Sequence, residues 1–235
     1  MLHKKGDRQD PGNYRPIALA CTEMKLFTYV LCQRLTKWAD ENAILPEAQA
    51  GFRKSRSCQE QVFNLTGAIQ IHLRKEKRRA YALFIDFARA FPSVPHDKLW
   101  KKLYDLGVSS KIIAVLQNLY ASATTVIRLH EGHSEPIEMT LGLLQGNSLS
   151  PLLFALYISD IEKVLLESQA DGLAVNHYTQ VHVLLFADDA VLLAPNVGAL
   201  RRKIEALEIY FDSLSLSVNI EKTKVVIFRK GRRIE

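Results

Sequence analysis

The sequence predicts an α+β fold in one domain that covers residues 1–235. Stretches with apolar residues at helical spacing alternate with short runs rich in valine, leucine, isoleucine and phenylalanine, which indicates helices mixed with strands. The chain contains neither an internal repeat nor a low-complexity linker, which favours one continuous unit. With 235 residues, 48% of them hydrophobic, it can bury a sizeable core.

The individual elements follow from periodicity and from residues that begin or end helices. In chain order we expect helices at 21–41 and 59–75, a buried strand at 81–87, helices at 96–107 and 109–121, strands at 124–130 and 136–142, helices at 148–168 and 198–216, and a strand at 224–228. Thr22 is placed to cap the first helix, and Gly107 suits the position after a helix end. The long helix at 148–168 would begin at Ser148 or Ser150, with Pro151 in its first turn.

Two adjacent carboxylates, Asp188 and Asp189, interrupt an apolar stretch between residues 182 and 194. A β-hairpin explains this pattern, with strands at 182–186 and 190–194 and the acids at the tight turn. The alternative is a buried helix whose acids cap another group. Both flanks are short and rich in valine and leucine, which favours the hairpin.

A third acid, Asp86, ends an otherwise hydrophobic strand. An unpaired charge buried there would be costly, and a cation is one way to compensate it. If this strand lies beside the hairpin, the carboxylates of Asp86 and Asp188 converge. Carboxylate oxygens suit Mg²⁺, and two such ions about 3.5 to 4 Å apart stabilise phosphoryl or nucleotidyl transfer. From these residues alone, polymerase, nuclease and phosphatase all remain open.

The formal charge of +6 permits an anionic partner. Basic residues gather in four clusters, at 3–8, 52–56, 73–79 and 228–233. Any one of them is explained by a solvated surface or a helix end. Together they favour a nucleic-acid backbone as partner.

The sequence also predicts a compartment. Three scattered cysteines without metal-site spacing indicate neither a disulfide framework nor a zinc site. The polar first residues show no signal peptide, and the apolar runs are too short to cross a membrane. We therefore expect an intracellular protein, in the nucleus or the cytoplasm, that is not secreted and has no membrane partner.

Six segments carry a resemblance to a known family. They are HKKGDRQDPGNYRPIAL, LPEAQAGFRKSRS, LFIDFARAFPSVPHDKLW, GLLQGNSLSPLLF, FADDAVLL and LSVNIEKTK, and in this order they span residues 3–224. They resemble the motifs of reverse transcriptases, the RNA-directed DNA polymerases, most closely those of non-LTR (LINE-type) retrotransposons. The resemblance implies a right-hand polymerase fold with an antiparallel palm sheet packed on helices. Fingers are expected at about 1–80 and 107–140, and the palm at about 81–106 and 141–235.

The resemblance also implies catalytic roles. Asp86 and Asp188 would hold two Mg²⁺ ions, for which Mn²⁺ can substitute, and Asp189 would lie beside the metals and support the turn. Phe87 would offer a backbone carbonyl to a metal. Phe91 would lie under the incoming sugar and exclude a 2′-hydroxyl, whereas the residues alone would favour a core aromatic.

Substrate contacts are implied in the same way. Arg15, assisted by Lys4 or Lys5, would bind the triphosphate of the incoming dNTP, as guanidinium groups suit phosphate oxygens. Lys222 would donate a proton to pyrophosphate, and a plain surface lysine is the alternative. The other expected dNTP contacts are Arg89, Ala90, Gln145 and Gly146, and the expected template contacts are Phe52 and Arg53.

The sequence departs from the family pattern at two positions. Pro92 and Asn147 stand where many relatives have aspartate, and we expect tuned substrate contacts there. The primer-grip hairpin, the helical thumb and any endonuclease segment of the family are not found in these 235 residues. We therefore expect either a fragment or a thumbless unit with weak processivity.

Three functions compete at this point. The first is an RNA-directed DNA polymerase whose partners are an RNA template, a DNA primer and dNTPs. The second is a catalytically weak or inactive thumbless remnant that binds nucleic acid. The third, a two-metal nuclease, lacks the histidine and glutamate clusters expected of it.

Overall fold

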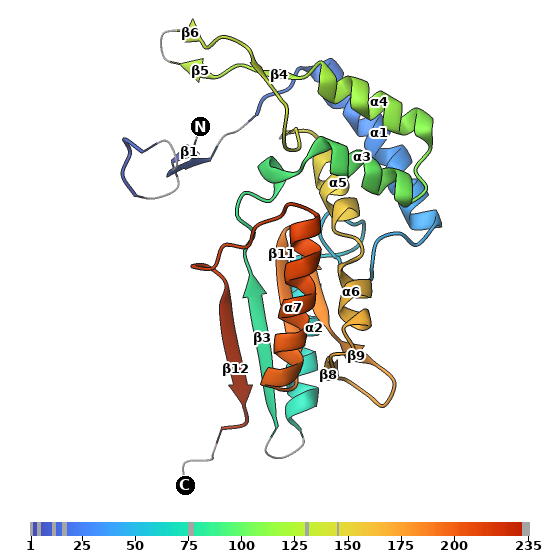
Figure 1. Cartoon of the computed structure of the whole chain (residues 1–235), viewed down its shortest axis with the longest axis vertical. Coiled ribbons are helices and arrows are strands. Elements are labelled where there is room, and N and C mark those ends of the chain that lie inside the picture. The colour runs from blue at the N-terminus through green and yellow to red at the C-terminus, as the bar shows by residue number, and fades with distance from the viewer. Residues whose placement is uncertain are drawn as a thin grey trace.

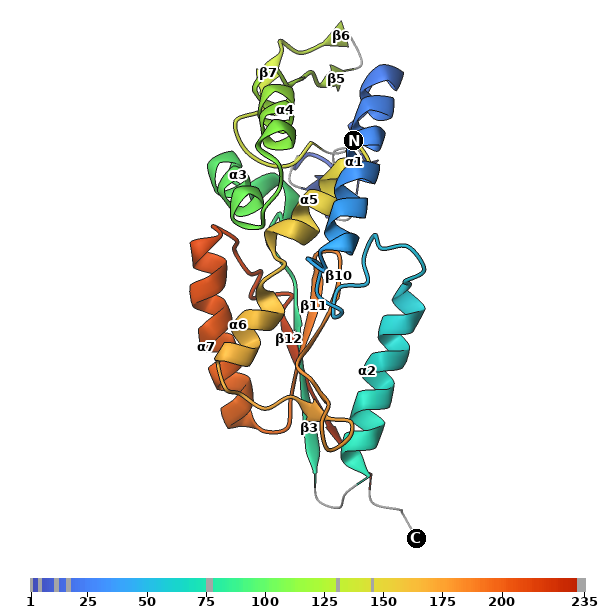
Figure 2. The same cartoon turned by 90° about the vertical axis from the view of Figure 1, so that its right-hand side faces the viewer.

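A four-stranded antiparallel sheet forms the centre of the molecule, in the order β10-β11-β3-β12. The computed structural model describes residues 2–3, 6–10, 13–15, 18–74, 78–129, 132–144 and 146–231. Helix α2 (Cys58–Leu73) covers one face of the sheet, and α6 (Ile161–Glu167) and α7 (Val197–Ser213) cover the other (Figure 2). A second group of helices lies beyond one end of the sheet (Figure 1).

Strand β3 (Arg79–Ile85) lies in the sheet interior and is buried along most of its length. It pairs with β11 (Asp189–Ala194) on one side and with β12 (Lys224–Arg229) on the other, and β10 (Val183–Phe186) pairs with β11. Alternate residues face opposite layers, as a strand requires. The predicted hairpin is thereby confirmed, and its helical alternative is wrong.

The second group of helices comprises α1 (Thr22–Glu41), α3 (His96–Asp105), α4 (Ser110–Ala121) and α5 (Leu149–Tyr157). Almost every side chain of α5 is buried, because α1 and α3 both pack against it. Gly107 has φ +88°, which confirms its predicted place after α3. The predicted cap at Thr22 is wrong, because Thr22 is already helical and the extended residue before it is Cys21.

The single long helix predicted for residues 148–168 is also wrong, because α5 and α6 are separate helices. The chain turns between them, where the Ser159 amide donates to the Leu156 carbonyl, three residues back. Lys102 from α3 binds the Asp160 carboxylate at this turn. Serine and aspartate side chains compete with the backbone hydrogen bonds of a helix, which favours a turn at this point. The buried Lys102 then stabilises the turn.

The remaining strands are short pairs. They are β1 (Leu2–His3) with β2 (Tyr14–Arg15), β4 (Thr124–Thr125) with β7 (Ile137–Glu138), β5 (Arg128–Leu129) with β6 (Gly132–His133), and β8 (Leu173–Ala174) with β9 (Gln180–Val181). The two continuous strands predicted at 124–130 and 136–142 are thus broken. The pairing is incomplete between Ile127 and Ser134. The Ser134 amide donates to the Ile127 carbonyl at 3.0 Å, but the Ile127 amide donates to the Ser134 hydroxyl, at 2.9 Å, and not to a backbone carbonyl.

No helix in the part of the chain that the structure describes is long and apolar enough to cross a membrane.

Candidate active site

The turn between β10 and β11 carries the acidic pair. Phe186 pairs with Asp189, so Ala187 and Asp188 make the connection. Ala187 has φ +60°, a left-handed conformation that costs a residue with a Cβ about 1–2 kcal/mol. Asp188 is half-buried, whereas Asp189 is exposed. Contacts outside the hairpin must therefore stabilise the turn.

Asp86 lies at the same edge of the sheet. Ile85 pairs with Ala190, and one further step in this antiparallel register places Asp86 opposite Asp189. The pKa of Asp189 is raised, first by partial burial and then by the negative charges of Asp188 and Asp86. The sheet therefore brings the three predicted carboxylates into electrostatic contact.

The segment before β12 fixes the backbone of Asp86. Its amide donates to the Thr223 hydroxyl at 3.3 Å, and its carbonyl accepts from the Asn219 amide at 2.7 Å. Lys222 Nζ lies 3.4 Å from Asp86 Oδ2. Because the Asp86 side chain is 38% exposed and has this ammonium partner, the expectation of a buried, unpaired charge is wrong.

The side chains that could bind a metal ion are few in the part of the chain that the structure describes. Among the residues described, no three His, Cys, Asp or Glu side chains are arranged to hold a metal ion between them. Mg²⁺ needs fewer protein ligands than that, because it takes one or two carboxylates and completes its shell with water and phosphate oxygens. Asp86 and Asp188 fit this requirement in type and number, provided that Lys222 releases Asp86.

Aromatic packing supports the residues after Asp86. Phe87 is buried and meets the rings of Phe154 and Phe211 edge to face, with centroids 6.3 and 5.0 Å away. The half-buried ring of Phe91 stacks on Phe154 with centroids 4.9 Å apart. Phe91 is thus anchored to the core while part of its ring stays accessible.

The other predicted dNTP contacts are placed in part. Arg89 is exposed, with φ +55°, and Ala90 is buried. Gly146 has φ +84°, and a Cβ there would lie 2.4 Å from the Ala18 carbonyl oxygen, so this position requires glycine. Lys4, Lys5 and Gln145 lie outside the described residues, as does the side chain of Arg15.

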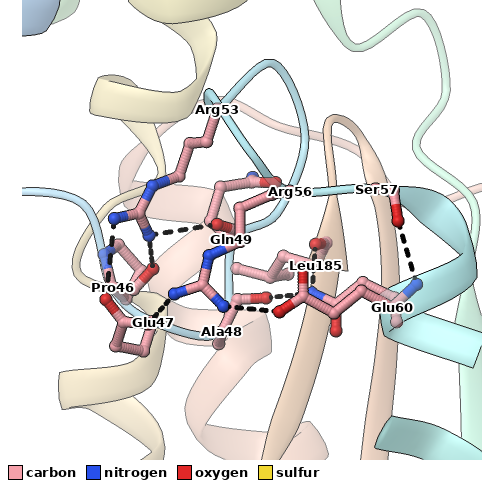
Figure 3. Close-up of polar contacts among 10 residues, drawn as sticks. Pro46, Glu47, Ala48, Gln49, Arg53, Arg56, Ser57, Glu60 and Leu185 are labelled. Atoms are coloured by element: carbon pink, nitrogen blue, oxygen red, sulfur yellow. Dashed lines mark hydrogen bonds and ion pairs between the residues drawn. The ribbon is translucent and has the colours of Figure 1, made fainter. Parts of the chain in front are cut away.

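The two predicted template contacts differ in their surroundings. Phe52 is 64% exposed. The guanidinium of Arg53 instead donates to the carbonyl oxygens of Pro46 and Gln49, at 3.1 and 3.2 Å (Figure 3). Phe52 is therefore free to meet a ligand, whereas Arg53 organises its own loop.

Two further polar residues have structural contacts here, and one of them, Gln49, was not expected from the sequence. Asn147, expected to tune substrate contacts, uses its side-chain oxygen to accept the amides of Leu149 and Ser150 at the start of α5. Gln49 is buried against the acidic turn. No local pattern marks Gln49, because its partner Ala187 lies 138 residues away in the sequence.

Solved structures identify the class of fold. The chain resembles an apo telomerase from Candida tropicalis with a TM-score of 0.60 and 19% identity, over 90% of this chain and 41% of that one. A telomerase from Candida albicans in complex with a fragment of telomeric RNA gives a TM-score of 0.61 and 18% identity, over 86% of this chain and 35% of the other. The fold is the right-hand polymerase fold.

Sequence comparison gives the family. The profile described as "Reverse transcriptase (RNA-dependent DNA polymerase)" matches residues 2–233, and the chain belongs to this family. It is 33% identical over 187 residues to the probable RNA-directed DNA polymerase from transposon BS of Drosophila melanogaster, covering 74% of this chain. It is 28% identical over 225 residues, 95% of this chain, to the Pol polyprotein of the R2 element of Popillia japonica. The matches cover only 20% and 31% of those relatives.

Proposed function

We propose that the chain is the fingers and palm of an RNA-directed DNA polymerase of a non-LTR retrotransposon. It would join the primer 3′-hydroxyl to the α-phosphate of a dNTP, with pyrophosphate as the leaving group. The observation that carries the proposal is the register of β3 and β11, which sets Asp86 beside the Asp188–Asp189 turn. Family membership supports the same reaction.

In this proposal Asp86 and Asp188 are the carboxylates that hold divalent metal, with Asp189 beside them. Reverse transcriptases normally use divalent metal, and Mg²⁺, or Mn²⁺ in its place, would neutralise charge on the reacting phosphates when bound. Phe87 would present its backbone carbonyl to the same site. Lys222, whose Nζ lies 3.4 Å from Asp86 Oδ2, would give a proton to departing pyrophosphate.

The remaining residues would hold substrates. Partly accessible Phe91 would lie under the sugar of the dNTP, and exposed Phe52 would meet the template. Arg53 would act on the template through the loop that its guanidinium organises. Further dNTP contacts would come from Lys5, Arg15, Arg89, Ala90, Gln145 and Gly146. An RNA template and a DNA primer complete the proposed set of partners.

Primer extension tests the proposal. The assay measures dTTP incorporation on poly(rA) primed with oligo(dT), with Mg²⁺ and with excess chelator. The wild type should incorporate dTTP only with the metal, and Asp188→Asn should lose roughly 100-fold or more of the rate, as expected for a group that acts on the transition state. Asp105→Asn, at an exposed acid that ends α3, is the matched control and should retain the wild-type rate.

Two outcomes would contradict the proposal. Undiminished extension by Asp188→Asn would remove that carboxylate from the mechanism. Tight binding of primed template by a wild type that incorporates no dTTP would establish instead a remnant that only binds nucleic acid.

A further inference from the structure

The loop at residues 48–51 lies against the acidic hairpin, although more than 130 residues separate them in sequence. Gln49 bridges to Leu185 of β10 in a parallel register. The Leu185 amide donates to the Ala48 carbonyl at 2.8 Å, and the Ala50 amide donates to the Leu185 carbonyl at 3.0 Å. The loop therefore pairs with the outer edge of β10 through one parallel bridge, two residues before Ala187.

The Gln49 side chain reaches the turn itself. Its Oε1 accepts the Ala187 amide at 3.0 Å, and its Nε2 donates to the Ala187 carbonyl at 3.2 Å. Oε1 also accepts the Gly51 amide at 2.8 Å, which fixes which end of the side-chain amide faces which partner. Gln49 is only 1% exposed, so these bonds are shielded from water. One buried amide thus binds both backbone polar groups of the residue before Asp188.

This contact acts on a strained residue. Ala187 has the left-handed conformation, and its ψ and φ determine where the Asp188 carboxylate points. Glycine at position 51 allows the close approach, because a Cβ there would lie 2.1 Å from the Ala187 amide nitrogen. The loop consequently forms a cradle, residues 48–51, that lies in close contact with the turn in this conformation.

Other bonds hold the cradle in place, as Figure 3 shows. Arg53 donates to the Gln49 carbonyl, and Arg56 pairs with both Glu47 and Glu60. Gln61 Nε2 donates to the carbonyls of Ala48 and Leu185, at 2.7 and 2.9 Å. Gln61 thus stabilises the junction of loop and strand through contacts that do not include Ala187.

We propose that Gln49 is a positioning residue that sets the orientation of the Asp188 carboxylate through Ala187. Its amide holds the acidic turn ready for metal before any substrate binds. The inference rests on the proposed function for its consequence in catalysis, but the contact itself concerns the metal-free protein.

Gln49→Met and Gln61→Met provide a matched comparison. Each removes one buried amide that bonds the same loop and strand, and methionine keeps the length of the side chain. Hydrogen exchange of the Ala187 amide, measured by NMR on the metal-free protein, should accelerate about 10-fold or more in Gln49→Met and change little in Gln61→Met. Mn²⁺ binding measured by electron paramagnetic resonance should weaken about 10-fold in Gln49→Met only, as for other residues that orient a ligand.

The rate of primer extension should also distinguish the two variants. Gln49→Met should lower kcat of primer extension with little change in KM for dTTP, because the orientation of the carboxylate and not the dNTP contacts is altered. Equal exchange and equal Mn²⁺ affinity in the two variants would overturn the proposal. Should Gln49→Met fail to fold, Gln49→Glu keeps both accepted bonds and loses the donated one. Faster exchange of the Asp188 amide, which shares a peptide unit with the Ala187 carbonyl, supports the proposal in that variant, and unchanged exchange of it rejects the proposal.

These results are distinguishable from failure of the proposed function. A wild type that neither binds Mn²⁺ nor extends primers would contradict the polymerase assignment. The exchange rate of Ala187 would still decide whether Gln49 holds the turn.

Discussion

The two ends of the β10–β11 hairpin differ in the sign and the burial of the charged side chains beside them. At the turn, Asp188 and Asp189 are partly or fully accessible and repel each other and Asp86. At the open end, Lys203 of α7 is 0% exposed and donates to the carbonyls of Leu193 and His182, at 2.7 and 3.5 Å. One end of the hairpin thus lies in a cluster of repelling carboxylates, of which Asp86 is paired with Lys222, and the other end is bonded to a buried lysine.

The pKa values express the same contrast. Burial lowers the pKa of Lys203 to about 7, and burial together with the charge of Lys203 lowers the pKa of His182 to about 4. The pKa of Asp189 is raised. We infer that the contacts at the open end stabilise the fold. The charges at the turn lower the free energy of unfolding of the metal-free protein, and they would favour the binding of a cation. Substitutions should therefore separate the two properties.

The largest effect on stability is expected at Lys203. Lys203→Ala removes the donor from two carbonyls and the packing of the aliphatic stem, and should cost about 3 kcal/mol of unfolding free energy. Lys203→Met keeps the volume and should cost about 1–2 kcal/mol. Urea denaturation measures both. Primer extension by folded enzyme should be unchanged, and a loss of kcat in either variant would break the separation of the two ends.

The pH dependence of the Lys203 effect has a defined sign. The unfolded lysine holds its proton up to its ordinary pKa of 10.5, whereas the folded one loses it near pH 7. The wild type therefore gains stability as pH rises above 7, and Lys203→Met does not share this gain. The difference in unfolding free energy between them should grow between pH 7 and 9.5. A constant difference would show that Lys203 stays charged in the folded protein.

Local pattern was sufficient to predict the strands that carry the acids. The runs of valine and leucine around Asp188 and before Asp86 have the length and composition of buried strands. The break between α5 and α6 was not predictable, because apolar periodicity continues through Ile158 and the turn depends on Lys102, which is distant in sequence. Tertiary contact overrode local preference there.

The same distinction applies to the candidate site. Asp86, Asp188 and Asp189 stand out because carboxylates are unusual within apolar runs. Gln49 sits in a polar loop, and its value lies in a contact with Ala187 that no local pattern records. Likewise, nothing in the sequence indicates that the Arg53 guanidinium is bonded to its own loop.

A substitution of Phe91 tests whether residues near the acidic turn also stabilise the fold. Its ring stacks on Phe154 of the core, so Phe91→Ala should cost about 2–3 kcal/mol of unfolding free energy, less than a fully buried phenylalanine. If the ring also lies under the sugar, the variant should incorporate ribonucleotides. The measurement is the ratio of kcat/KM for dTTP and UTP. An unchanged ratio in a destabilised variant would leave Phe91 a packing residue only.

His182, at the open end, should have a moderate and pH-dependent effect on the free energy of unfolding. Its folded pKa is about 4 against an ordinary value of 6.5, so the unfolded state takes up a proton first as pH falls. The wild type should therefore lose stability between pH 6.5 and 4, by about 1–2 kcal/mol, because water partly screens the half-buried ring. His182→Gln should lose less over this range in urea denaturation. Parallel pH profiles would show that His182 does not titrate in this way.

The smallest effect, and the one of opposite sign, is expected at Asp189. Asp189→Asn removes one of three mutually repelling charges and should raise the unfolding free energy at pH 7 by less than about 1 kcal/mol, given the exposure of the group. A raised folded pKa favours the protonated form, so the gain should be present above that pKa and vanish below pH 3.8. It should also shrink at high salt, which screens exposed charges. A loss of stability at pH 7 would mean that attractive contacts of this carboxylate outweigh the repulsion, and the two ends of the hairpin would then differ less than their charges indicate.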